Sequence, residues 1–143
     1  MPERFVEIYA KANPGYANSF LHNAISNPQS DCPCKKAATD LAMQMASGQV
    51  YKMAQLTFFI EGYATQEQCL AFIMSNRYFP NNIKGVDEAS RYYYNEELQN
   101  LNDYEMLELI AMSGNTYFFD KKRFPEQLSK EVMRIKKRIK DGQ

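Results

Sequence analysis

Apolar residues recur at helical spacing along most of this chain and predict a mainly helical protein. Residues 35–47 show the pattern simply, because Ala38, Leu41, Ala42 and Met45 fall at positions i, i+3, i+4 and i+7. Similar patterns and breaks predict helices over residues 3–11, 16–25, 65–77, 86–94, 102–112 and 125–139. Tyr117-Phe118-Phe119 is the only segment of β-like composition, and we interpret it as a packed loop.

Residues 50–62 differ from the other predicted helices because they leave almost no polar face. Met53, Leu56, Phe58, Phe59 and Ile60 point in all directions around a helix. A helix that is apolar all round is usually buried in the middle of a fold. The pattern therefore predicts that this helix is central.

Capping patterns mark the start of three helices. Thr65 with Gln68 has the spacing of a capping box, and Asn102 with Glu105 has the same spacing with Asn as the capping residue. Pro125 fits the first position of the last helix, where a missing backbone N–H costs nothing.

Length and composition indicate one compact domain. The chain has 143 residues, 45% of them apolar and 24% charged, and it contains six Gly and six Pro. That length can bury a sizeable single core, and so few helix breakers favour helices over a sandwich or barrel. No apolar run approaches the length of a membrane span, and no signal peptide is recognisable at the start of the sequence.

The neutral net charge hides an asymmetry between the body and the end of the chain. Residues 121–143 hold nine of the 17 Lys and Arg but three of the 17 Asp and Glu. Such a basic helix either contacts a phosphate or an anionic membrane surface, or presents a solvated face. The acidic remainder argues against nucleic acid as a partner.

Cysteine and histidine exclude several kinds of site. Three cysteines are a poor disulfide framework, and Cys32-Pro33-Cys34 matches neither a redox motif nor a usual zinc half-site. His22 has no nucleophile context and is interpreted as a surface or capping residue. We therefore expect no metal and no cofactor.

No local motif for catalysis is present, and the strongest isolated candidate is a carboxylate. The chain has no Gly-rich phosphate loop, no GxSxG and no HExxH. Glu61 ends the most apolar helix, where it either acts as a general acid or pairs with Lys52 or Arg77. The run of Tyr92, Tyr93 and Tyr94 either stacks on a sugar or a base, or packs in the core.

Residues 85–111 carry a recognisable pattern. They begin Gly-Val-Asp-Glu-Ala-Ser-Arg-Tyr-Tyr-Tyr, reach Leu101 eight residues after Tyr93, and reach Glu105 four residues later. This stretch is similar to the peptidoglycan glycosyltransferase (transglycosylase, glycosyltransferase family 51) domain of class A penicillin-binding proteins. The family has an aromatic pair and an Asn upstream, where this chain has Tyr78-Phe79 and Asn81. The resemblance covers mainly residues 65–139 and implies an all-α, lysozyme-like helical lobe.

The chain departs from this family at the positions that carry its chemistry. The family uses two carboxylates, and in an ungapped alignment from Gly85 the second one falls on Ala71, with the Asn of the same motif on Ser75. The opening carboxylate falls on Pro2, so Glu3 and Glu7 are stand-ins. The family's segment that grips the lipid diphosphate falls on residues 33–40 and keeps almost none of its chemistry.

Three hypotheses follow from this combination of a kept scaffold pattern and lost motifs. The first is a transglycosylase-like pseudoenzyme that binds a glycan, a lipid-linked precursor or a protein partner. The second is an active enzyme with relocated carboxylates, the candidates being Glu3, Glu7, Glu61 and Glu67, two of which would face one cleft about 5–10 Å apart. The third is a cytosolic helical interaction protein. The sequence as it stands fits the cytoplasm, whereas removal of an N-terminal anchor would imply a periplasmic or membrane-associated protein.

Overall fold

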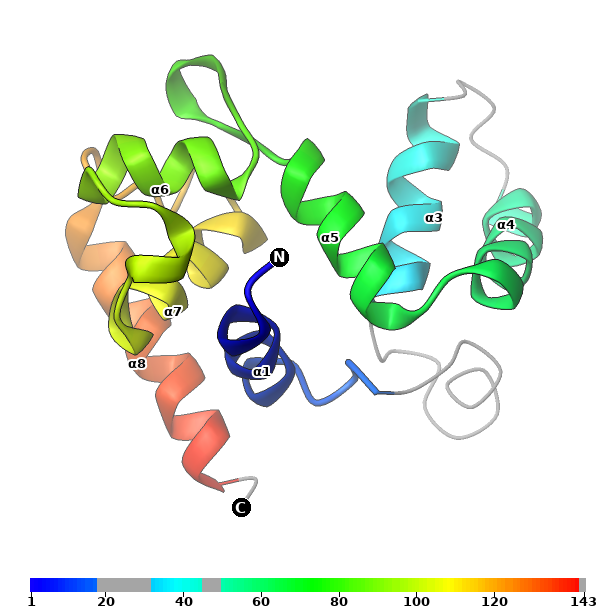
Figure 1. The fold of residues 1–143 in the computed structure, drawn as a ribbon, viewed down its shortest axis with the longest axis horizontal. Helices are drawn as coiled ribbons and strands as arrows, with labels where there is room; N and C mark the ends of the chain where they lie inside the picture. The colour runs from blue at the N-terminus through cyan, green and yellow to red at the C-terminus, as the bar shows by residue number, and fades with distance from the viewer. Residues whose placement is uncertain (18–31, 45–49, 142–143) are drawn as a thin grey trace. The chain divides into compact units, whose positions relative to one another are not determined.

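The computed structural model describes residues 1–17, 32–44 and 50–141, which form two compact units (Figure 1). Unit 1 combines Met1–Ala12 with Met74–Gln143, and unit 2 spans Asn13–Ile73. Helix α5 (Gln66–Asn76) runs from unit 2 into unit 1. The prediction of a single domain stays a prediction.

Unit 1 contains most of the helices and the only strands among the described residues. Its elements are α1 (Glu3–Ala12), β1 (Tyr78–Phe79), the 3-10 turn η1 (Pro80–Asn82), β2 (Ile83–Lys84), α6 (Val86–Tyr94), the 3-10 turn η2 (Leu98–Asn100), α7 (Asp103–Gly114) and α8 (Pro125–Asp141). The two short strands pair antiparallel, with Phe79 opposite Ile83. The all-α prediction is confirmed. Residues 117–119, interpreted as a packed loop, form a turn in which Tyr117 and Phe118 are exposed.

Helix α7 is the central helix of unit 1. All residues from Met106 to Ser113 are buried, because α1, α6 and α8 all pack against this helix. Phe5 of α1 and Val132 of α8 are fully buried beside it. Helix α8, predicted over residues 125–139, buries an apolar stripe through Leu128, Val132 and Ile135 and leaves its basic face exposed.

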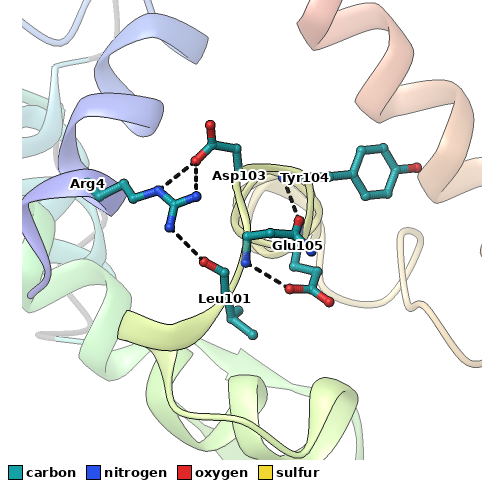
Figure 2. A network of polar contacts seen from close by, with 6 residues as sticks. Arg4, Leu101, Asp103, Tyr104 and Glu105 are labelled. Carbon is teal, nitrogen blue, oxygen red and sulfur yellow. Dashed lines mark hydrogen bonds and ion pairs between the residues drawn. The ribbon is translucent and has the colours of Figure 1, made fainter.

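Polar contacts hold α1 to the start of α7 and to the end of α8. The Arg4 guanidinium donates to Asp103 Oδ1 at 2.7 Å and to the Leu101 carbonyl at 3.2 Å, and it forms an ion pair with Asp103 (Figure 2). Arg138 donates to the carbonyl of Ala12 at 3.1 Å. Because Arg4 and Asp103 are largely exposed, their ion pair fixes geometry more than it adds stability.

Unit 2 contains α3 (Pro33–Gln44), α4 (Val50–Tyr63) and most of α5. A disulfide joins Cys34 at the start of α3 to Cys69 in α5. Around it lies a small apolar cluster with Ala37, Ile73 and the partly buried Ile60. The view that three cysteines are a poor disulfide framework is therefore corrected: two cysteines 35 positions apart pair, and the buried Cys32 is left as a free thiol.

The prediction that the helix over residues 50–62 is buried in the middle of the fold is also wrong for its described side chains. Helix α4 forms as expected, but Phe58 is 46% exposed, Phe59 64% and Tyr63 81%. Helix α4 packs mainly against α3, so one face is covered while other apolar side chains meet solvent. The apolar composition was sufficient to predict a helix here, but the number of neighbouring helices decides how many of its side chains are buried.

The predicted helix starts are confirmed, whereas other predictions fall on residues that the structure does not describe. Both capping boxes are confirmed by reciprocal hydrogen bonds, between Thr65 and Gln68 and between Asn102 and Glu105. Pro125 is the first residue of α8. The helix predicted over residues 16–25 lies largely outside the described residues, as does His22. None of the described helices is both long and apolar enough to cross a bilayer.

Candidate functional site

A tight backbone contact joins the end of α5 to the start of α6. Asn81 and Asn82 both adopt left-handed conformations, with φ of 64° and 60°, and reverse the chain between β1 and β2. Gly85 then adopts φ 86° and donates its backbone N–H to the Arg77 carbonyl at 2.8 Å. A Cβ on Gly85 would lie 2.9 Å from the Ser75 carbonyl oxygen, so only glycine fits.

Helix α5 carries the two residues on which the family's second catalytic motif falls in the ungapped alignment from Gly85. Ala71 lies half-buried on α5, and Ser75 is exposed one turn later. A methyl group can neither accept a proton nor hold a charged partner. Gly85 belongs to the segment that carries the resemblance, whereas Ala71 and Ser75 differ from the residues of the family's motif.

A polar pocket of about 370 Å³ lies in unit 1, where the first residues of the chain meet α6 and η2. Asp87 and Arg91 stand one turn apart on α6, and α6 ends at Asn95 in a left-handed conformation that redirects the chain. Glu97 and Gln99 follow in the next turn. The pocket is lined by Met1, Pro2, Asp87, Arg91, Glu97, Leu98 and Gln99.

The pocket offers a mixed set of hydrogen-bonding groups to a ligand. Two carboxylates, a guanidinium and an amide face the same space, and Gln99 donates to Glu97 at 2.9 Å. Such a set suits a hydroxylated, uncharged or weakly charged molecule, because both donors and acceptors are available. No motif in the sequence indicated these residues as a site, although Asp87 lies within the Gly-Val-Asp segment that carries the resemblance.

Two of the sequence-predicted carboxylates, Glu3 and Glu7, are exposed on α1 in unit 1. Neither lines the polar pocket, although Pro2 beside Glu3 does. Glu67 is exposed at the first turn of α5 in unit 2. A catalytic role for these residues stays a prediction.

Glu61 lies in unit 2 beside the free thiol. Its Oε1 accepts hydrogen bonds from Gln66 Nε2 at 2.9 Å and from Cys32 Sγ at 3.5 Å, and Gln66 in turn accepts from the backbone N–H of Cys34 at 3.0 Å. Burial raises the pKa of the Cys32 thiol, and the neighbouring carboxylate raises it further. Because a thiolate is the reactive form, these surroundings suppress nucleophilic chemistry at Cys32.

The tyrosine run on α6 has a structural role. Tyr94 donates to Glu108 at 2.8 Å, and Lys121 pairs with the same carboxylate at 2.7 Å. Tyr93 donates to the buried Asp120, whose other oxygen caps the turn before α8. Burial raises the pKa of both tyrosine hydroxyls, and the carboxylates raise it further. Of the two alternatives given for this run, packing within the protein agrees with the contacts of Tyr93 and Tyr94.

No group of three or more His, Cys, Asp or Glu side chains within the described ranges could hold a metal ion.

A search of curated proteins finds no match to this chain. A family model described as transglycosylase matches residues 38–140, which include α5, the Gly85 contact, α6, α7 and nearly all of α8. The match agrees with the resemblance seen in residues 65–139 and with the helical, lysozyme-like architecture. The chain therefore belongs to the transglycosylase family.

Proposed function

We propose that this transglycosylase-family domain has lost glycan polymerisation and acts as a binding module for a glycan or its lipid-linked precursor. The proposal rests on Ala71 of α5, on which the family's second catalytic carboxylate falls in the ungapped alignment from Gly85. A positioned acid or base contributes on the order of 10²–10⁴-fold to such a reaction. Replacement by a methyl group removes that contribution.

The segment that would grip a diphosphate supports the same proposal. Residues 33–40 form the first part of α3, where Cys34 is in a disulfide and Ala37 and Ala38 are buried. Disulfide-bonded and buried side chains cannot contact a diphosphate, although Lys35 and Lys36 of the same segment could still neutralise its charge. The missing carboxylate and the changed residues of this segment are two reasons to expect weak or absent turnover.

The polar pocket supports retained binding. Asp87, Arg91, Glu97 and Gln99 supply donors and acceptors of the kind that sugar hydroxyl and amide groups require. Pro2, where the family's opening carboxylate falls, lines the same pocket. This coincidence supports binding at a place where the residue that would perform chemistry has changed.

Polymerisation of lipid-linked disaccharide by the purified protein tests the loss of activity. We expect no polymer above a protein-free blank, and polymer formation at a rate proportional to protein concentration would refute the proposal. Binding is tested with a soluble peptidoglycan fragment by calorimetry. We expect Arg91→Ala to weaken binding about 10-fold or more, because a charge-assisted hydrogen bond is lost. Arg134→Ala on the exposed face of α8 is the matched control.

A second candidate function is an active enzyme with relocated carboxylates, favoured by the presence of Asp87 and Glu97 in one pocket. If the protein is such an enzyme, we expect Asp87→Asn or Glu97→Gln to abolish its cleavage of a glycan strand or its transfer of a glycosyl group. Glu3→Gln, Glu7→Gln and Glu61→Gln test the candidates found in the sequence. Absence of turnover by the unmodified protein would dismiss the whole set.

Membrane proximity and an oxidising compartment are further parts of the proposal. The exposed Phe58, Phe59 and Tyr63 of α4 give unit 2 an apolar surface that suits a bilayer interface. The Cys34–Cys69 disulfide suits a compartment outside the cytoplasm. Co-sedimentation with anionic vesicles, compared between the unmodified protein and Phe59→Ser, tests membrane proximity. Mass spectrometry after alkylation of protein from its native host tests whether the disulfide forms there, and therefore whether the compartment is oxidising.

A further inference from the structure

A groove separate from the polar pocket crosses unit 1 on α1, α7 and α8. It encloses about 340 Å³, and its lining is mostly apolar. Leu107 of α7 is buried at its floor, and Ile8 of α1 and Ile139 of α8 are half-buried. The remaining lining residues are Lys11, Asp103, Tyr104 and Lys136.

The charges around this groove are unbalanced. Asp103 is engaged by Arg4, as Figure 2 shows, while the Tyr104 ring extends from the other side of α7. Lys136 lies over that ring with its Nζ 4.3 Å from the centroid. In the described part of the chain no carboxylate pairs with Lys11 or Lys136. Among the described residues, two cations therefore flank an apolar floor with no carboxylate paired to either of them.

The same character continues along α8 beyond the groove. Met133, Lys136 and Lys140 are exposed and follow one another at helical i, i+3, i+7 spacing, so they share one side of the helix. Met133 is 62% exposed, which is unusual for so apolar a side chain. The recess is therefore part of a strip of alternating apolar and basic side chains, longer than a small molecule would cover.

We propose that this strip binds an acidic amphipathic helix of a partner protein. Apolar side chains of such a helix would enter the recess over Leu107, and its carboxylates would pair with Lys11 and Lys136. This is the helix-in-groove mode of recognition, with charge complementarity fixing orientation and association rate. The inference does not depend on the loss of glycan polymerisation, because the groove and the polar pocket share no lining residue.

The probe is a fluorescein-labelled 18-residue helical peptide with Leu at i, i+3, i+7 and i+10 and Glu on either side of that stripe. A second peptide carries Lys at each Glu position. Fluorescence anisotropy with the full chain should show saturable binding of the acidic peptide that weakens as salt increases, and no binding of the basic one. Equal binding of both peptides, or of neither, would overturn the proposal.

Charge reversal locates the contact. Lys11→Glu with Lys136→Glu should weaken binding of the acidic peptide by about 10-fold or more, because two attractions become repulsions. Lys130→Glu with Lys137→Glu changes the net charge equally outside the groove and should reduce affinity less than about threefold. Ile8→Ser should reduce affinity without changing the salt dependence. Equal loss in both charge-reversed variants would show non-specific attraction and overturn the proposal.

A small anionic amphiphile is the competing occupant. Laurate is added to the peptide complex and, separately, to the free protein. If laurate binds with the same dependence on Lys11 and Lys136 while the acidic peptide does not bind, the groove holds an amphiphile and the proposal is wrong. Peptide binding that survives saturating laurate would also be incompatible with occupancy of the recess.

Discussion

Gly85→Ala should destabilise unit 1 far more than a single methyl group would suggest. Gly85 has φ 86° and ψ 158°, a region that residues with a Cβ avoid. The added Cβ would also stand 2.9 Å from the Ser75 carbonyl oxygen and 3.4 Å from its carbonyl carbon. Because these atoms belong to the backbone, they cannot rotate away as a side chain would.

The conformational strain alone costs about 1–3 kcal/mol. With the steric contact, we expect the free energy of unfolding to fall by about 2–4 kcal/mol and Tm by about 5–15 °C. Urea denaturation followed by far-UV circular dichroism measures the free energy of unfolding, and calorimetry measures Tm. Gly114→Ala is the matched control, since nothing lies within 4 Å of its added Cβ at the end of α7.

We expect Gly114→Ala to leave stability unchanged or to raise it by up to about 1 kcal/mol. A Gly85→Ala protein within about 0.5 kcal/mol of the unmodified protein would refute the reasoning. That result would mean that the turn after β2 relaxes freely, so the contact between α5 and α6 would not constrain the backbone.

Three further predictions concern the polar and covalent contacts of each unit. Tyr94→Phe should cost about 1–3 kcal/mol of unfolding free energy, because the buried Glu108 loses a donor; urea denaturation checks this. Breaking the disulfide by the double change Cys34→Ser and Cys69→Ser should cost about 4 kcal/mol of the stability of unit 2, measured by hydrogen exchange of its helices. Stability should also decline as pH rises above about 9, because raised pKa values of Cys32 and Tyr94 mean that the folded state retains protons that the unfolded state releases; denaturation at pH 7 to 10.5 checks the sign.

The parts of the fold that the sequence predicted well have local causes. The capping boxes at Thr65 and Asn102 depend on groups three residues apart, so their spacing was sufficient. The helix predicted over residues 125–139 depends only on the helical periodicity of its apolar residues, which α8 buries at Leu128, Val132 and Ile135. Pro125 begins its helix for the equally local reason that a missing N–H is harmless there.

The parts that could not be predicted depend on distant segments. Nothing in the spacing of three cysteines indicates that Cys34 meets Cys69, because the approach of α3 to α5 decides it. Helix α4 and helix α7 are both apolar, yet only α7 is enclosed, since three helices cover it. The polar pocket likewise depends on the turn at Asn95, which brings Glu97 back toward Asp87.

The discontinuous make-up of unit 1 has a consequence for how the chain folds during synthesis. Helix α1 leaves the ribosome well before its partners α7 and α8, because the Arg4–Asp103 and Arg138–Ala12 contacts join residues 99 and 126 positions apart. Unit 2 is continuous, so its contacts can form while the rest is still being translated. Until α7 emerges, the apolar face of α1 is exposed to solvent because the helices that bury it have not been synthesised. A chaperone that binds α1 during translation should therefore raise the yield of native protein more than a chaperone that acts after the chain is released.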